Sequence, residues 1–446
     1  MRAKMPVLLS VLIFLLIFSS VPTTSADAGN VPFDDSLLVQ EDGRLKDISE
    51  SQMLSYPEVL QIAKKHIQGY LADDIQTKDR TITASTNLIP LYDLSDQIIA
   101  YAVPLLERER EIGYISVGAL RDGYDAYDIF IDDSAVQRLH QSLSNPSIMA
   151  ASEERRIIFV PPMTYMLQVT DGGRQQYFEM NEGLQSLRDV TESVEENMDE
   201  FQQTYETIRS EENQEYMDQI LDGYVGFRAA AAVAKEDVSL TVEANQSMFV
   251  PVQDGSGYSY GGNQNWYSQN THKDRGCGPV AAANITNYLA KITNPSTYGA
   301  LYSGNTTSKQ DFLAHMDTMY DYVSPGILGK ISVSGFASAV ESYAKDKKVN
   351  LNRVTDNSAF TLDNTAAYIK AGLKLNSPVA TLNLSKFSDY DYEWHWMTIT
   401  KYYRDTTDSR WIAVSTWGQR RSINYRTHFD AITSYRSLGG GFMYFK

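Results

Sequence analysis

The sequence predicts an α+β protein in which a smaller α+β domain and a helical linker precede a larger α+β domain. Two observations predict this class. Several segments repeat apolar residues every three or four positions, as amphipathic helices do, and others alternate or cluster β-branched and aromatic residues between turn signals. These segments form two groups, at residues 48–180 and 245–446, separated by a long acidic helical pattern.

Residues 1–28 have the pattern of a secretory signal peptide. A basic start is followed by the apolar run 7–18 and by small and polar residues up to Ala26 and Ala28, after either of which we expect cleavage. The apolar run falls short of the roughly 20 residues that span a membrane. No cysteine follows it, which argues against a lipid anchor. We therefore expect a secreted, extracellular protein with no stable membrane anchor.

A small α+β domain is expected over residues 48–180, after a polar lead-in. Ser55-Tyr-Pro-Glu58 has the form of a capping box, and the apolar positions after it predict a helix to Leu71. A helix followed by antiparallel strands is typical of an α+β domain. Strands are expected at 82–94, 97–106, 113–120 and 127–131, with further elements at 136–143 and at 155–169, the last interrupted by Pro161-Pro162.

Residues 184–260 are predicted to connect the two domains. Residues 184–226 have apolar side chains at spacings of three and four and an acidic polar face, which predicts one amphipathic helix. Residues 235–260 end in a run of Gly, Ser and Tyr, and we interpret them as a linker.

Charge is distributed unevenly along the chain. Residues 241–446 carry 20 Lys+Arg and 16 Asp+Glu, which leaves 19 and 40 of the totals of 39 and 56 for residues 1–240. The first half therefore carries about −21 and the second about +4, and this favours attraction between them. An acidic solubilising arm is the alternative interpretation. The sequence has no basic stripe with interleaved aromatic residues, so we expect no nucleic-acid partner.

Cys277 is the only cysteine in the 446 residues and lies in Gly276-Cys-Gly-Pro279, at the start of a predicted helix. Proline suits the first turn of a helix, and apolar residues recur at helical spacing from Val280 to Leu289. The unpaired amides and the dipole at a helix N-terminus favour the thiolate, which is the attacking form of cysteine. The flanking glycines allow a substrate carbonyl to come close, and the Cys277 amide is placed to donate to an oxyanion. The alternative is a small apolar cysteine packed at a helix end.

An exported protein with one cysteine cannot form an internal disulfide, so a reactive thiol is favoured over a merely packed one. There is no cysteine pair and no closely spaced histidine pair among His66, His140, His272, His315, His395 and His428. We therefore expect no metal site and no organic cofactor.

His395 is the histidine best placed to act with Cys277. It lies near the start of the β-type run 394–402, and a hairpin through 404–410 leads to a second strand at 411–416 and then to Trp417-Gly418. A Cys–His pair needs both side chains on rigid elements, which a helix and a strand provide. A packed histidine ring is the alternative. The remaining predicted elements are helices at 308–322, 334–345 and 362–375 and a strand at 379–384.

These motifs resemble those of papain-like cysteine peptidases, and most closely those of secreted bacterial enzymes similar to bacteriocin leader peptidases. The resemblance covers roughly residues 245–446 and is carried by Gly276-Cys-Gly-Pro-Val-Ala-Ala-Ala-Asn284, Ser377-Pro-Val-Ala-Thr-Leu-Asn-Leu384, Trp394-His-Trp-Met-Thr-Ile-Thr-Lys-Tyr402 and Val414-Ser-Thr-Trp-Gly418. It implies a nucleophile helix packed on an antiparallel sheet, with Cys277 and His395 as catalytic residues. It also implies that the N-terminal domain is an inhibitory or chaperoning pro-domain and that the chain is a zymogen.

The sequence departs from the family pattern at two positions. The family's Asn or Asp that orients the histidine is matched by Ser415, with Asp405, Asp408 and Asp430 as alternatives. Thr271 stands where the oxyanion-hole glutamine is expected, which leaves Gln269 or Asn270, with Gln264 and Asn265 as further alternatives. We assign Gly276, Gly278 and Trp417 to substrate contact or ring packing.

We therefore predict a secreted thiol protease that hydrolyses peptide bonds through a Cys277 thioester. A peptide or protein is the expected substrate, and the chain's own N-terminal domain is the expected intramolecular inhibitor. Three alternatives stay open. They are a cell-wall peptide amidase or endopeptidase, an acyl or peptidyl transferase, and a catalytically inactive papain-like surface binding protein.

Overall fold

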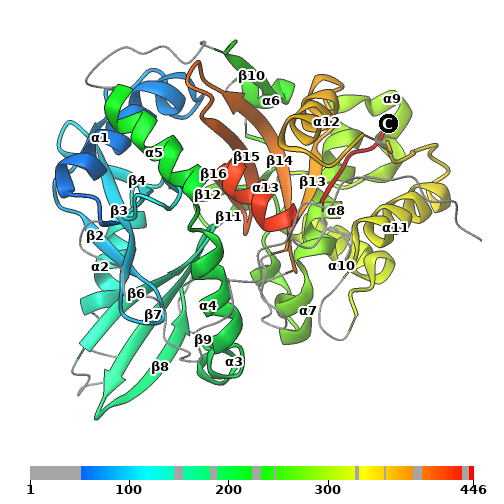
Figure 1. Cartoon of the computed structure of the whole chain (residues 1–446). Helices are drawn as coiled ribbons and strands as arrows, with labels where there is room; N and C mark the ends of the chain where they lie inside the picture. Colours follow the sequence, from blue (N-terminus) through cyan, green and yellow to red (C-terminus); the bar gives the residue numbers. More distant parts are fainter. Residues whose placement is uncertain are drawn as a thin grey trace, which may run out of the picture. The chain divides into compact units, whose positions relative to one another are not determined.

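One large β-sheet, antiparallel at every described strand pair except β2 with β6, runs through the protein (Figure 1). The structure is a computed structural model that describes residues 52–144, 154–180, 188–223, 233–245, 248–326, 331–355, 358–384, 394–433 and 441–446. The predicted signal peptide and polar lead-in lie outside these ranges. No helix within them is long and apolar enough to cross a membrane. The α+β prediction is confirmed.

The N-terminal half is a sheet with helices on both faces. Apolar residues of α2, α3 and α4 pack on one face, and those of α1 and α5 pack on the other. Its elements are α1 (Tyr56–His66), β1 (Thr83–Ala84), β2 (Ile89–Tyr92), β3 (Ile98–Glu107), β4 (Arg110–Gly118), β5 (Ala126–Phe130), α2 (Ala135–Ser144), β6 (Glu154–Val160), β7 (Thr164–Asp171), β8 (Arg174–Glu179), β9 (Arg188–Asp189), α3 (Thr191–Glu196), α4 (Met198–Thr207) and α5 (Glu211–Gly223). The predicted start of α1 is confirmed, since the Glu58 carboxylate accepts from the Ser55 amide at 2.8 Å.

The connecting segment differs from the prediction in two ways. The expected single helix is three short helices, α3, α4 and α5, preceded by β9. The expected linker is ordered structure, in which β10 (Glu236–Ser239) pairs with β14, α6 (Thr241–Ala244) follows, and β11 (Pro251–Asp254) and β12 (Gly257–Tyr260) form a hairpin. The side chains of Glu243 and Tyr260 are buried. Residues 236–260 therefore belong to the fold of the C-terminal half.

The C-terminal half combines a helical group with the other end of the large sheet. Its elements are α7 (Asn270–Arg275), α8 (Cys277–Tyr288), α9 (Pro295–Tyr298), α10 (Lys309–Val323), α11 (Val333–Asp346), α12 (Leu362–Lys374), β13 (Val379–Leu384), β14 (Trp394–Arg404), β15 (Arg410–Thr416), β16 (Gln419–Asn424), α13 (Tyr425–Thr433) and β17 (Gly441–Met443). The helices and strands predicted after residue 270 are confirmed to within a few residues at their ends. Every residue of α8 is buried, because the helix packs between β14 and the helices α10 and α11.

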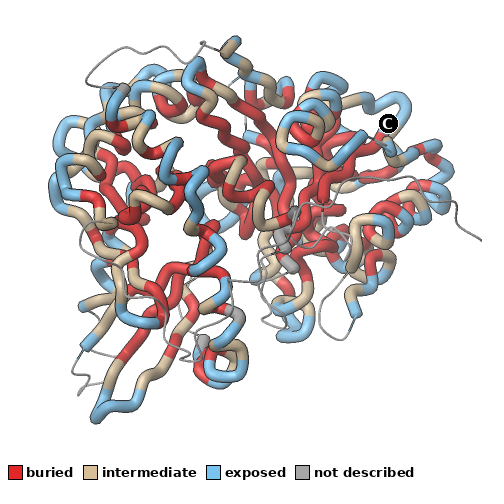
Figure 2. The backbone as a smooth tube through the Cα atoms, viewed as in Figure 1, coloured by how far each residue is buried: buried red, intermediate tan, exposed pale blue. Residues whose placement is uncertain are grey.

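The two halves share the sheet, whose described strand order is β17-β13-β14-β15-β16-β5-β4-β3-β2-β6-β7-β8-β9. The junction is the pairing of β16 with β5, through Ser422 with Ile129 and Ile423 with Asp128. Figure 2 shows buried backbone continuing through the central strands, with exposed residues on the outer turns of the helices. Residues 45–446 accordingly form one compact unit.

Candidate active site

Cys277 is the first residue of α8, at the point where this helix meets β14. Gly276 before it has no room for a side chain, because a Cβ atom there would collide with the His272 carbonyl and the Tyr267 ring. The turn into the helix therefore requires glycine at this position. Gly278 lies against β14, since a Cβ atom built on it would be 3.4 Å from the Trp396 ring.

The Cys277 thiol is influenced by backbone amides on both elements. The amides of Trp396 on β14, of Gly278 and of Cys277 itself favour the thiolate, but burial has the larger effect and raises the pKa of the Cys277 thiol. The thiol is only 9% exposed. Because the Trp396 amide reaches the sulfur, Cys277 lies beside the residue that follows His395 on β14.

His395 is held from two sides. Its Nε2 atom lies 2.6 Å from Oγ1 of Thr416, and its ring stacks on Trp417 with 4.2 Å between centroids and an interplanar angle of 15°. Burial lowers the pKa of His395 to about 3, and the nearby Arg421 guanidinium adds to this effect. The histidine is therefore neutral at neutral pH, and the buried Cys277 side chain is a protonated thiol.

The residue that contacts His395 is Thr416, which corrects the prediction for Ser415. Side chains alternate along a strand, so Ser415 points away from the histidine. Its hydroxyl donates to the Tyr260 carbonyl at 2.6 Å and accepts from the Asn284 amide at 3.4 Å. None of the alternative aspartates has a hydrogen bond to His395 among the described residues. In the turn between β14 and β15, Asp405 accepts from the Thr407 amide and Asp408 accepts from the Arg404 guanidinium. Asp430 accepts from the Tyr124 hydroxyl.

The turn between β15 and β16 carries the two contacts to His395. Thr416 pairs with Gln419, so Trp417 and Gly418 form a two-residue loop, and both have positive φ, 46° and 75°. A positive φ is unusual for a bulky residue and marks a backbone that its surroundings hold in place. Trp417 thus packs on the histidine ring, in agreement with the prediction of ring packing.

The predicted oxyanion residues Gln269 and Asn270 lie at the start of α7 with exposed side chains. Gln264, named as an alternative, is half-buried and its Nε2 donates to the Lys273 carbonyl at 2.8 Å, in the segment that leads to Cys277. Asn265 is exposed. Gln264 is therefore the side-chain amide that the structure ties to the nucleophile segment.

A residue of the N-terminal half is buried in the same apolar cluster as Cys277 and Trp417. This residue is Met163, which lies in the turn between β6 and β7 and is 2% exposed. In the sequence, only the Pro161-Pro162 interruption marks this turn. The apolar cluster that contains Cys277 thus includes residues of both halves of the chain.

Buried ion pairs also join the halves next to the site. Arg420 binds Asp74 at 2.7 Å and Arg421 binds Asp128 at 3.1 Å, and Arg420 also binds Glu243 within the C-terminal half. All of these side chains are at least 93% buried in the structure. Burial weakens the screening of such pairs by salt, which differs from the exposed attraction that the uneven charge predicted.

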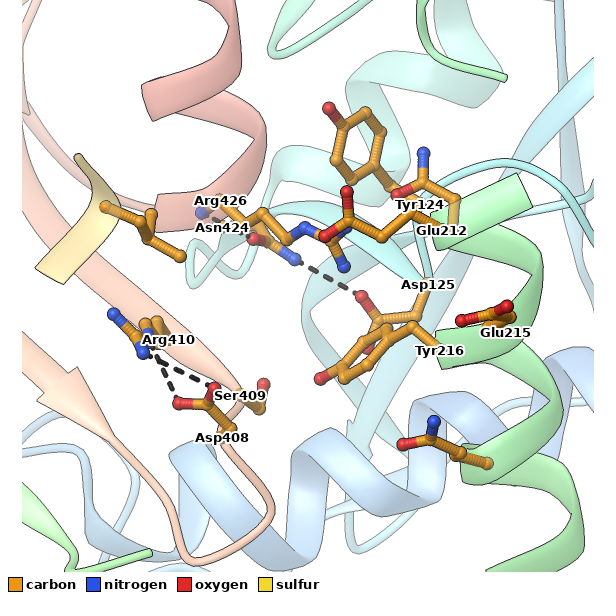
Figure 3. A pocket seen from close by; sticks show the side chains of 13 residues that line it. Tyr124, Asp125, Glu212, Glu215, Tyr216, Asp408, Ser409, Arg410, Asn424 and Arg426 are labelled. Atoms are coloured by element: carbon orange, nitrogen blue, oxygen red, sulfur yellow. Dashed lines mark hydrogen bonds and ion pairs between the residues drawn. The ribbon is translucent and has the colours of Figure 1, made fainter. Parts of the chain in front are cut away.

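A separate cavity of about 260 Å³ is lined mainly by residues of α5, by residues 408–410 and by Asn424 and Arg426. Figure 3 shows these side chains. Asn424 donates to Asp125 at 3.3 Å there, and Arg410 donates to Asp408 at 2.9 Å. Neither Cys277 nor His395 lines this cavity. Within the described part of the chain, no cluster of three or more His, Cys, Asp or Glu side chains is arranged to hold a metal ion.

Comparison with known proteins does not identify a family. No protein-family model matches the sequence, and no curated protein matches it significantly.

Proposed function

We propose that this protein is a cysteine peptidase of papain-like fold, secreted as a precursor and kept closed in the intact chain by its N-terminal half. The observation that carries the proposal is the meeting of α8 and β14. There the backbone amide of Trp396 favours the Cys277 thiolate, while the preceding residue, His395, is hydrogen-bonded to Thr416 and stacked on Trp417. A thiol at a helix N-terminus beside an oriented imidazole is an arrangement suited to acyl transfer.

In the proposed reaction His395 Nδ1 takes the proton of the Cys277 thiol, because Nε2 is engaged by Thr416. The thiolate attacks the carbonyl carbon of the scissile peptide, and the new oxyanion is stabilised by the Cys277 amide and the Gln264 side chain. The C–N bond then breaks as the imidazolium returns its proton to the leaving amine. Water, deprotonated by His395, attacks the thioester, which releases the carboxylic acid and restores the thiol.

The closed state follows from burial. In the described structure the thiol and the imidazole are 9% and 5% exposed, and burial disfavours the thiolate–imidazolium form of the pair. Separation of the β6–β7 turn from the Cys277 cluster would let water reach both groups and restore the ion pair. The N-terminal half would thus inhibit in two ways, by blocking access of substrate to Cys277 and by keeping the Cys277 thiol protonated and the His395 imidazole neutral.

The test is labelling and hydrolysis by the full chain. Because the full chain is mostly closed, iodoacetamide should modify Cys277 slowly and a fluorescence-quenched peptide library should be cleaved at a low basal rate, with both signals lost in Cys277→Ala while the fold is retained. Peptide hydrolysis that survives in Cys277→Ala would remove the covalent mechanism. Purified cell-wall fragments and a free amine acceptor, analysed by mass spectrometry in the same assay, distinguish wall-peptide hydrolysis and acyl transfer from protein hydrolysis.

A further inference from the structure

Residues 260–262, which we call the strap, pass between the nucleophile helix and the turn that holds His395. On one side the Gly262 amide donates to Oδ1 of Asn284 on α8 at 2.8 Å. On the other side the Tyr260 amide donates to the Gly418 carbonyl at 2.6 Å, and the Tyr260 carbonyl accepts from Ser415 at 2.6 Å. The strap therefore connects the element that carries Cys277 with the element that fixes His395.

The strap is packed so closely that position 261 has no room for a side chain. Gly261 has φ +93°, and a Cβ atom there would collide with the Ser415 hydroxyl and approach the Asn284 amide to 2.9 Å. Asn284 and Ser415 are each 2% exposed, and they contact each other at 3.4 Å. The Asn284 and Ser415 side chains thus contact the strap backbone on both sides. Only glycine at position 261 lets the backbone approach them this closely.

The strap leads directly to Gln264. The short 3₁₀ helix Gln264–Trp266 begins two residues after Gly262, and the Gln264 amide is tied to the Lys273 carbonyl ahead of Cys277. A shift of the strap would therefore displace Gln264 relative to the sulfur. Oxyanion stabilisation depends steeply on donor placement, so a displacement of about 1 Å can cost roughly 100-fold in rate.

We propose that Ser415 and Asn284 are positioning residues that hold the strap, and through it the oxyanion donor Gln264, in register with Cys277. This inference rests on the proposed peptidase function and deepens it. It gives Ser415 a role distinct from the orientation of His395, which belongs to Thr416. An oxyanion forms only on the way to the tetrahedral intermediate, so its stabilisation acts in the transition state and not on bound substrate. Loss of the Ser415 and Asn284 contacts to the strap should therefore lower kcat with little change in KM.

The test compares Ser415→Ala with Ser377→Ala in the full chain, using basal hydrolysis of the peptide library's best substrate. Ser377 is a matched control, because it is 1% exposed and donates to the Phe445 carbonyl at 2.8 Å outside the strap. Ser415→Ala should lower kcat by about 10- to 100-fold with KM changed by less than about two-fold. Its pH profile should match that of the parent, and Ser415→Thr, which keeps the hydroxyl, should recover most of kcat.

A second readout does not need turnover. Hydrogen exchange at the Gly262 amide should be about ten-fold faster in Ser415→Ala than in the parent, and unchanged in Ser377→Ala. If the parent is active and Ser415→Ala has the same kcat as the parent, the positioning role alone is overturned. Unchanged hydrogen exchange at the Gly262 amide in Ser415→Ala would also overturn it. If Cys277 is labelled but neither the parent nor Met163→Ala, which should weaken closure, cleaves peptide faster than Cys277→Ala, the peptidase function and the positioning role are overturned together.

Discussion

Thr416 Oγ1 lies 2.6 Å from Nε2 of His395, and both side chains are at least 95% buried. The hydroxyl engages Nε2, which leaves Nδ1 as the ring nitrogen that acts on the thiol in the proposed reaction. A hydroxyl is a neutral partner, so it orients the imidazole without stabilising the imidazolium by charge. This relationship determines what substitutions at the two positions should do.

His395→Ala should lower kcat/KM by about 1,000-fold or more, because it removes the base that forms the thiolate. Thr416→Ala should cost about 10-fold, since water can replace part of the orienting contact. Thr416→Ser, which keeps the hydroxyl, is the control and should retain most activity. The measurement is kcat/KM on the peptide library. Equal losses for His395→Ala and Thr416→Ser would show that packing at this turn, and not the hydrogen bond, sets the activity.

The burial of Met163 in the apolar cluster that also contains Cys277 predicts faster labelling of Cys277 when the turn between β6 and β7 is weakened. Met163→Ala removes a buried side chain of the N-terminal half from the Cys277 cluster, and it should raise the iodoacetamide labelling rate of Cys277 by about 10-fold, a free-energy change of about 1.4 kcal/mol in closure. Met319→Ala is the control, because Met319 is 0% exposed in the same cluster but belongs to α10. If both variants accelerate labelling equally, general loosening of the core explains the effect and the turn has no special role.

The buried pair between Arg420 and Asp74 predicts strong coupling between the halves. Asp74→Asn leaves Arg420 with one carboxylate fewer in a buried site, so it should lower the free energy of unfolding by about 3 to 5 kcal/mol. Asp363→Asn, which removes a largely exposed carboxylate from Arg410 and leaves the pair of Arg410 with Asp408, should cost no more than about 1 kcal/mol. Denaturant unfolding at 0.05 and 1 M NaCl measures both. A large salt dependence of the Asp74→Asn effect would contradict a buried contact.

The sequence predicts most of the C-terminal half because its local signals agree with its packing. The strands β14 and β15 follow from β-type residues on either side of a turn, and α8 from a proline in the first turn and a buried apolar pattern. Segment 236–239, Glu-Asp-Val-Ser, carries no such signal. It becomes β10 because it pairs with β14 and because Glu236 and Asp237 meet Lys370 and Lys401 from distant segments.

In the candidate site, too, some residues are predictable from local sequence signals and others depend on tertiary packing. Cys277 and His395 stand out by residue type and by place in the chain, so sequence identifies them. The choice between Ser415 and Thr416 depends on which face of β15 each side chain occupies, and a shift of one residue reverses the answer. The alternation along the strand up to Trp417-Gly418 was the signal available for this choice. Met163 had no local signal, since its role comes from contact between halves.

Three buried histidines predict loss of stability in mild acid. Burial lowers the pKa of His315, His395 and His428 to about 3, whereas unfolding restores ordinary values near 6.5. The unfolded chain therefore binds more protons below about pH 6.5, so the contribution of each neutral histidine is complete above that pH and is lost as the pH falls toward 3. Each should add about 1.4 kcal/mol per pH unit to the slope.

His428→Gln isolates one of these contributions. His428 is fully buried, with Nε2 2.8 Å from the Thr381 hydroxyl, and it contacts the Phe442 ring. Denaturant unfolding between pH 7.5 and 4.5 should show a lower slope in this variant, by an amount that rises from near zero above pH 7 to about 1.4 kcal/mol per pH unit near pH 5. Phe442→Leu is the control, because it disturbs the same packing without removing a titrating group and should keep the parent slope. A parent slope that persists in His428→Gln would mean that His428 keeps an ordinary pKa in the folded chain.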